Sequence, residues 1–257
     1  MRYRVDSHET MQVQDFDADH PKEGRMITDR KRAIITGILF IVATAASLVG
    51  TAIRGSILDA PDYLAKISEY QSRVILSAIF QFAEAATSAG IAMSLYPVLR
   101  KHNEGLAIGS VGFRIIEGVF YLVAALGLLS LVSLSHEYVK AGSTLAPQFQ
   151  VIGIMLMAVR KWAGFVLGVS AFCLGASMYY YVFFRTKLVP RWLSVWGLIA
   201  LSMLLTMAIL VMFGGEPSGM MLVLALPIAL QEMVLAIWLI LRGFDPTADK
   251  PRESSQH

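Results

Sequence analysis

Charged side chains interrupt four long apolar stretches of this sequence, and they are the residues best placed to do chemistry. They are Glu84, Arg114, Glu117, Arg160 and Glu232. A charge at the centre of a membrane-spanning helix costs roughly 2.5–3.5 kcal/mol, so five charges facing lipid would cost on the order of 15 kcal/mol. We therefore expect these side chains to face one another, or water, in one polar centre.

The spacing of the polar residues supports such a centre. In the stretch 74–99 they recur at steps of four, three and four, which places them on one helical face: Ser77, Gln81, Glu84 and Ser88. Arg114 and Glu117 are three residues apart, which is close enough to pair on one face of a helix. The predicted site comprises five charged residues and two neutral hydrogen-bonding residues: Glu84, Arg114, Glu117, Arg160, Glu232, Gln81 and Gln231.

Three functions are compatible with a buried cluster of this kind. In a small-molecule or ion transporter or binding protein, the arginines would hold an anionic group and a glutamate would exchange a proton. In a structural or regulatory membrane protein without a substrate, the ion pairs would fix the register of the helices. In a lipid-modifying intramembrane enzyme, the glutamates would serve as the reactive carboxylates. The residues favour the first function and leave the other two open.

Residues typical of other catalytic or metal sites are few. The five histidines fall in predicted tails or loops, no predicted helix carries an aspartate, and the one cysteine, Cys173, has no nearby base. Intramembrane metal hydrolases and serine proteases need such groups at depth. We therefore predict no catalytic residues, no metal ligands and no cofactor, and the balance favours a protein that is not an enzyme.

The composition points to lipid as the surrounding solvent. Hydrophobic residues make up 56% of the 257 positions and charged residues only 16%, well below the share typical of soluble domains. The formal net charge of +3 does not indicate a nucleic-acid partner, because the basic residues form short clusters between apolar runs. The expected partners are membrane lipids and a small-molecule or ion ligand, and the oligomeric state is left open.

Six apolar stretches are long enough to cross a bilayer, which predicts an all-α, six-helix membrane bundle. They cover residues 33–53, 74–99, 106–134, 151–184, 192–213 and 220–241. The fourth is too long for one perpendicular crossing, so we expect it to begin at the interface and cross from about Trp162, or to tilt strongly. The predicted membrane domain is 33–243, with disordered cytoplasmic tails at 1–32 and 244–257.

The distribution of basic residues predicts the orientation in the membrane. With both chain ends on one side, fifteen lysines and arginines lie on that side, and four lie on the other: Arg54, Lys66, Arg73 and Lys140. Cytoplasmic regions of membrane proteins carry the excess of basic residues. We therefore expect both termini in the cytoplasm and the protein in the cell membrane.

Four stretches of the chain together resemble a known family. They are "RKRAIITGILFIVATAASLVG" from Arg30, "YPVLRKHNEGLAIGSVGFRIIEG" from Tyr96, "KLVPRWLSVWGLI" from Lys187 and "LALPIALQEMVLAIWLILRGF" from Leu224. The resemblance covers residues 26–246 and is to the prokaryotic membrane-protein family catalogued as domain of unknown function 4386. It implies a prokaryotic multi-pass membrane protein, and it implies no activity because none is assigned to the family. The resemblance implies that family members begin just before the first "RK", so we expect Met26 to be the native start and residues 1–25 to be either an extension or the result of a wrongly assigned start.

Overall fold

The computed structural model describes residues 20–142, 146–214 and 218–249, and it is helical almost throughout, with no strand in these ranges. This confirms the all-α prediction. The long helices are α1 (His20–Arg54), α3 (Gln71–Leu99), α4 (Glu104–Ala141), α5 (Ala146–Arg160), α6 (Val169–Thr186), α7 (Arg191–Met212) and α8 (Ser218–Leu241). A short helix, α2 (Tyr63–Glu69), lies in the connection between α1 and α3.

Within the described ranges, six helical segments are long and apolar enough to cross a membrane. They are Ile27–Arg54, Gln71–Leu99, Glu104–Ala141, Ala146–Thr186, Arg191–Met212 and Val223–Leu241. The number agrees with the six predicted crossings, and the chain is a multi-pass membrane protein. The fourth segment is continuous from Ala146, because the π-helical segment Lys161–Gly168 joins α5 to α6 without a break. No separate interfacial turn precedes a crossing at Trp162.

The two expected tails are shorter in the structure than in the sequence prediction. Helix α1 begins at His20, so residues 20–32 are helical, and Pro246–Asp249 form a 3₁₀ turn. The early start brings Asp29 into a helix, where its carboxylate accepts a hydrogen bond from the Lys101 ammonium at 2.5 Å. His136 was expected in a loop and lies in α4 instead. The disorder predicted for residues 1–19 and 250–257 lies outside the described residues.

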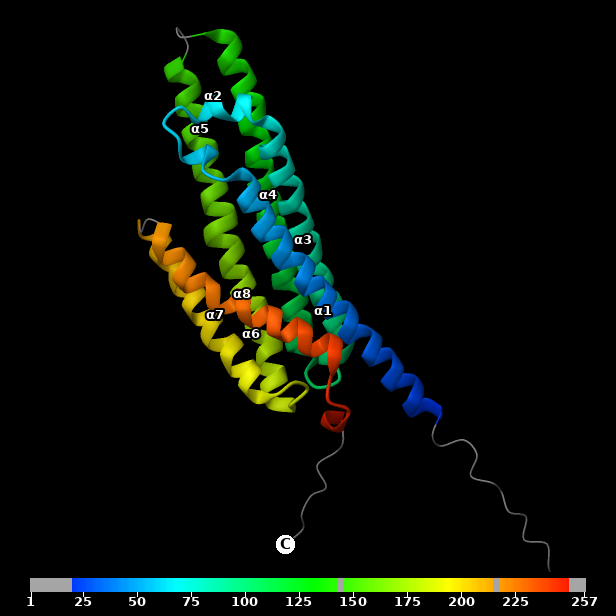
Figure 1. Ribbon diagram of the computed structural model, residues 1–257. Coiled ribbons are helices and arrows are strands. Elements are labelled where there is room, and N and C mark those ends of the chain that lie inside the picture. The colour runs from blue at the N-terminus through cyan, green and yellow to red at the C-terminus, as the bar shows by residue number, and fades with distance from the viewer. Residues whose placement is uncertain (1–19, 143–145, 215–217, 250–257) are drawn as a thin grey trace, which may run out of the picture.

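The six crossings form a closed ring. Each helix packs against the next in the order α1, α3, α4, α6, α7 and α8, and α8 returns to pack against α1. Figure 1 shows that α1 begins and α8 ends at the same end of the molecule, which we call the proximal end. At the opposite, distal end, α4 and α5 extend beyond the other helices, and α2 lies across them (Figure 1).

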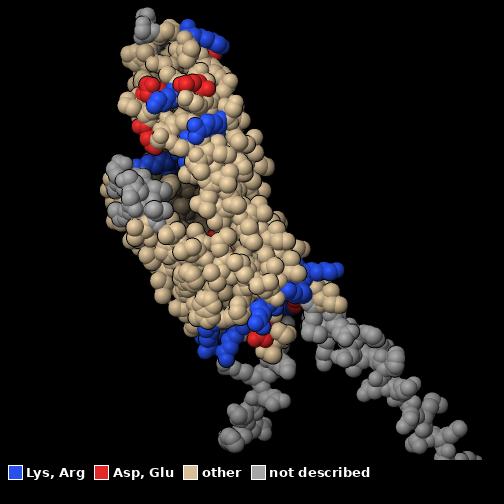
Figure 2. All heavy atoms as spheres, viewed as in Figure 1, with Lys and Arg blue, Asp and Glu red and all other residues tan. Residues whose placement is uncertain are grey.

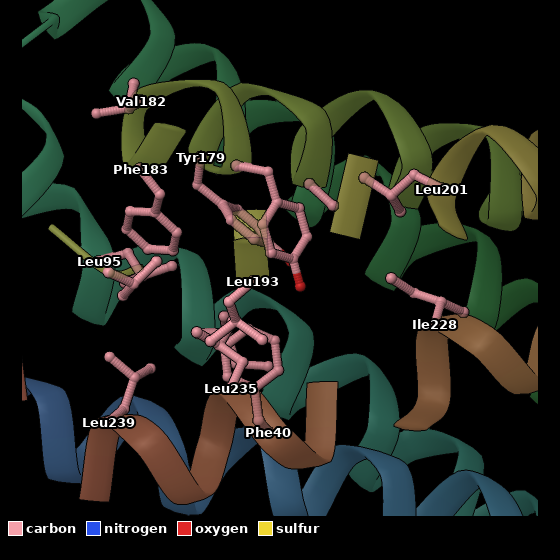
Figure 3. Close-up of a cluster of buried hydrophobic side chains, with 14 of the residues drawn as sticks. Phe40, Leu95, Tyr179, Val182, Phe183, Leu193, Leu201, Ile228, Leu235 and Leu239 are labelled. Carbon is pink, nitrogen blue, oxygen red and sulfur yellow. The ribbon is translucent and has the colours of Figure 1, made fainter. Parts of the chain in front are cut away.

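Two hydrophobic clusters lie at different levels of the bundle, and the proximal one closes the ring. The proximal cluster is rich in aromatic residues and includes Phe40, Tyr179, Tyr180 and Phe183, with the Tyr179 and Tyr180 ring centroids 4.6 Å apart (Figure 3). The distal cluster packs α2 against residues such as Leu128 of α4. On α3 and α4, the residues between these clusters are the polar ones found by their spacing. The ring is therefore packed at its proximal level, α2 to α5 are packed at the distal level, and a polar level lies between the two.

Helices α1 and α8 meet closely only in the proximal half. A Cβ atom on Gly37 would lie 2.7 Å from the carbonyl oxygen of Ala236, so the two backbones nearly touch there. The Arg30 guanidinium donates hydrogen bonds to the carbonyl oxygens of Leu239 at 3.1 Å and Ile240 at 2.6 Å, which satisfies the C-terminal end of α8. From this crossing the two helices diverge toward the distal end (Figure 1).

Candidate functional site

A cavity of about 620 Å³ lies at the polar level of the ring. Figure 2 shows the visible face of the molecule hollowed, with basic side chains beside the hollow. Walls of the cavity come from α1, α3, α4, α5, α6, α7, α8 and the π-helical segment. Six of the seven residues predicted from the sequence line it: Gln81, Glu84, Arg114, Glu117, Arg160 and Glu232. The fold thus brings together side chains from four separate helices.

Helix α1 contributes a polar face that the sequence prediction missed. Its residues follow steps of three, four and three, and all of them line the cavity: Thr44, Ser47, Thr51 and Arg54. This spacing places them on one helical face. The spacing is visible in the sequence, but no charge interrupts the apolar stretch 33–53, and Arg54 directly follows it. Tyr121 of α4 was also missed, although it lies four residues after Glu117 on the same face.

Arg114 and Glu117 form a buried ion pair on α4. Their side chains are 3.0 Å apart, from Nη1 to Oε2, and the residues are only 2% and 3% exposed. The Ser88 hydroxyl of α3 donates a hydrogen bond to the same carboxylate at 2.8 Å. Phe172 of α6 packs under the guanidinium, with its ring centroid 4.8 Å from Cζ, in a cation–π contact. Three helices therefore hold this pair in one position.

The ion pair leaves donors of Arg114 unused. Nη1 is near the Glu117 carboxylate, but its N–H is not aimed well enough to make a hydrogen bond, and Nε has no partner either. Buried donors without partners carry a cost in free energy unless water or a ligand satisfies them. Arg114 therefore presents hydrogen-bonding capacity to the cavity it lines.

Glu84 and Glu232 line the same cavity without a cationic partner. Among the described residues neither carboxylate makes an ion pair, and Oε1 of Glu232 is buried without a hydrogen bond. Glu84 faces the Ser47 side chain of α1. The sequence predicted a near balance of acids and bases in one cluster. In the structure, this level holds three carboxylates and one guanidinium, since the other arginines of the cavity lie elsewhere along it.

Arg54 and Arg160 occupy the distal part of the cavity. Arg54 Nη1 donates a hydrogen bond to the Ser77 hydroxyl at 3.2 Å, and Ser77 lies seven residues before Glu84 on α3. At 1.5 Å per residue, this places Arg54 about 10 Å from the level of Glu84. The Arg160 backbone packs against Gly127 of α4, and its Nε is buried without a hydrogen-bond partner. Arg160 was predicted to join the central cluster, and it lies distal to that cluster instead.

Gln231 belongs to the proximal packing and is not among the residues that line the cavity. It is fully buried, its side-chain oxygen accepts a hydrogen bond from the Tyr180 hydroxyl at 2.5 Å, and its Nε2 donates one to the Leu193 carbonyl at 3.1 Å. One residue along a helix turns a side chain by about 100°. Glu232 therefore faces the cavity, while Gln231 ties α8 to α6 and α7.

Irregular helix geometry flanks the cavity on two sides. Gly164, Phe165 and Val169 line it from the π-helical segment and the start of α6, and π-helical turns occur frequently at functional sites. On the opposite wall, Pro227 lies inside α8 between the lining residues Ala225 and Ile228. A proline inside a helix removes a backbone hydrogen bond. Both walls therefore contain helical turns that are less firmly bonded than a regular α-helix.

In the ranges that the structure describes, no three His, Cys, Asp or Glu residues are grouped in a way that could hold a metal ion. Cys173 is buried, and its Sγ lies 3.6 Å from the carbonyl oxygen of Leu201. The chemistry of the cavity is therefore that of carboxylates, guanidinium groups and hydroxyls.

Comparison with known proteins assigns the chain to a family without giving it an activity. No curated protein and no solved structure matches the chain. One family model matches residues 35–243, which include the six cavity residues predicted from the sequence. The chain thus belongs to the family described as Domain of unknown function (DUF4386).

Proposed function

We propose that the protein is a small-molecule binding protein or transporter of the membrane, and that Glu84 and Glu232 bind the positive charge of its ligand or a proton in its place. The observation that carries this proposal is the presence of two carboxylates on one cavity without a cationic partner. Three carboxylates and one guanidinium at one level give an excess of negative charge. A low-dielectric interior makes such an excess costly unless a proton or a bound cation neutralises it.

The buried ion pair has a different part in this proposal. Arg114 and Glu117 neutralise each other, and Ser88 and Phe172 fix them from α3 and α6. The structural role considered for the whole cluster therefore suits this pair. It does not account for Glu84 and Glu232, because a carboxylate that only stabilises helix packing needs a partner to offset its desolvation.

The position of the cavity supports transport as well as binding. The proximal aromatic cluster closes the ring beneath it, and the cavity opens on the face shown in Figure 2. Carriers that work by alternating access hold their substrate near mid-membrane, with one side closed and the other open. The close crossing of α1 and α8 at Gly37 is the contact that would separate if the proximal side opened.

The orientation follows from the charge bias. We propose that both termini lie in the cytoplasm of a prokaryotic cell and that the proximal end faces the cytoplasm. The fifteen-to-four distribution of basic residues supports this assignment. The cavity would then open toward the outer half of the cell membrane.

The test uses tetraphenylphosphonium as a probe for the cation site. Binding to purified protein in a nonionic maltoside is measured by equilibrium dialysis for the wild type, Glu84→Gln and Glu232→Gln. Each substitution keeps the size of the side chain and removes its charge, so each should weaken binding by about tenfold or more. Binding should also weaken when the pH is lowered enough to protonate the carboxylates, because the cation and the proton then compete.

Glu137→Gln is the matched control, since Glu137 lies on α4 outside the cavity, exposed and paired with Lys140. It should bind the probe as the wild type does. Equal binding by the wild type and both cavity variants, with all proteins folded, would refute the proposal. A melting temperature measured on each preparation separates loss of binding from loss of fold.

A further inference from the structure

The cavity is electrically polar along its length. Its deep part holds Glu84 and Glu232 without cationic partners, and its distal part holds Arg54 and Arg160. Asp59 is the acidic residue near the two arginines, and no ion pair joins it to either of them. One cavity therefore offers carboxylates at one level and guanidinium groups at another.

Two independent measures place the two levels about 10 Å apart. Along α3, Ser77, which accepts the hydrogen bond from Arg54, is seven residues from Glu84. The second measure uses the fourth crossing, where Gly164 lies at the level of Gln81 on α3. Arg160 is one helical turn distal to Gly164, and Gln81 is one turn distal to Glu84. Arg160 is therefore about two turns, or about 10 Å, distal to the level of Glu84.

Polar atoms at both levels have no partner within the protein. Nε of Arg160, Oε1 of Gln81 and Oε1 of Glu232 are all buried without a hydrogen bond. From the distal level to the deep level they are one donor, on Arg160, followed by two acceptors, on Gln81 and Glu232. A molecule that carries both kinds of group could satisfy them together, whereas a simple cation would leave the guanidinium groups unsatisfied.

Apolar side chains line the cavity where it opens toward lipid, beside the hydroxyl groups of Thr44, Ser47 and Thr51 on α1. Between the diverging distal halves of α1 and α8, the lining includes Leu48, which is 63% exposed, and Ile228. An exposed leucine on a membrane-spanning helix faces hydrocarbon. A ligand with an apolar part could keep that part at this opening while its polar part reached the interior.

We infer that the ligand is a zwitterionic amphiphile, whose amine binds at Glu84 and Glu232 and whose phosphate or carboxylate binds at Arg160 and Arg54. The hydrocarbon part leaves the cavity between α1 and α8. This inference rests on the proposed function, since it assigns the cation site to one end of a longer ligand. Beyond the cation site, it assigns to the ligand an anionic group and an apolar part. It also assigns the ligand's direction, with the amine in the deep part of the cavity and the anionic group in the distal part.

The experiment compares three probes with the same short acyl chains and different head groups. Dihexanoyl phosphatidylethanolamine is zwitterionic, dihexanoyl phosphatidylglycerol is anionic, and dihexanoyl trimethylammonium-propane is cationic. Dissociation constants are measured by isothermal titration calorimetry in maltoside. The zwitterion should bind about tenfold tighter than either singly charged lipid, the ratio that one additional charge-assisted hydrogen bond gives. Free phosphoethanolamine, the same head group without chains, should bind more weakly than the lipid.

Variants then assign the anionic end. Arg160→Gln should remove the preference for the zwitterion, because it weakens binding of the zwitterion and does not weaken binding of the cationic lipid, whereas Arg160→Lys should keep most of the preference. Lys161→Gln is the control, because Lys161 is the next residue and does not line the cavity. If Arg160→Gln does not fold, Arg54→Gln takes its place, with the same expected result.

The outcomes separate this inference from the proposed function. If the cationic lipid binds as tightly as the zwitterion, and its binding still depends on Glu84 and Glu232, only the zwitterion inference fails. If no probe shows dependence on Glu84 or Glu232, the proposed function fails as well. If phosphoethanolamine binds as tightly as the lipid, the apolar part of the inference is wrong and the ligand is a free zwitterion.

Discussion

The Arg114 guanidinium lies 3.0 Å from the Glu117 carboxylate, one helical turn away on α4, and both residues are almost completely buried. One guanidinium cannot balance three carboxylates, so Glu84 and Glu232 have no ion pair of their own among the described residues. The fold therefore divides the polar residues into a fixed pair and two carboxylates that face a cavity. This division is the reason to expect different results when the acids are replaced one at a time.

Replacing Glu117 by leucine should destabilise the protein strongly. The substitution leaves the Arg114 charge buried without a partner, which costs about 3–5 kcal/mol. Reversible unfolding in mixed detergent measures the free energy of unfolding. The double variant Glu117→Leu with Arg114→Met should recover much of the loss, because it removes both charges. A single variant as stable as the wild type would show that the pair is not buried as described.

Replacing Tyr180 by phenylalanine should lower stability and leave the cavity unaffected. The variant deprives the Gln231 side-chain oxygen of its hydrogen bond at a fully buried position, at a cost of about 1–3 kcal/mol. Tetraphenylphosphonium binding, measured beside the unfolding free energy, should match that of the wild type. Weakened binding by a stably folded Tyr180→Phe variant would mean that Gln231 contributes to the ligand site after all.

Replacing Gly37 by alanine should disturb the crossing of α1 and α8. The new Cβ would lie 2.7 Å from both the Ala236 carbonyl oxygen and Cγ1 of Ile240, and overpacking of this kind costs about 1–3 kcal/mol. Gly112→Ala is the matched control, because a Cβ there meets nothing within 4 Å. An alanine in place of that helical glycine should stabilise α4 by about 0.5–1 kcal/mol. The melting temperatures should therefore move in opposite directions.

Cysteine labelling tests the proposed orientation. The native Cys173 is buried and should react little, so single added cysteines can be read against a low background. Arg185→Cys marks the proximal end and Lys140→Cys the distal end, and both positions are exposed. With a membrane-impermeant maleimide on intact cells, only Lys140→Cys should be labelled. Labelling of Arg185→Cys alone would reverse the orientation.

The sequence by itself determined the class of fold and the identity of the charged cavity residues other than Arg54. The bilayer imposes strong rules: a span needs about 20 apolar residues, and charges within it must face inward. From these rules, composition and spacing predict the six crossings and seven site residues, six of which line the cavity. An uncharged hydroxyl costs less in the bilayer than a charge, so it does not have to face inward. For this reason, the sequence does not identify the α1 face that carries Thr44, Ser47 and Thr51 as part of the cavity.

The tertiary structure alone decided how these residues are grouped. Depth along a helix follows from counting residues, but rotation about the helix axis depends on how neighbours pack. For this reason, Gln231 faces the proximal core while the adjacent Glu232 faces the cavity. The length of the unbroken fourth crossing likewise set Arg160 at the distal level, away from Glu84. Which acids are paired and which are not is a property of that packing, and it is what points to a ligand.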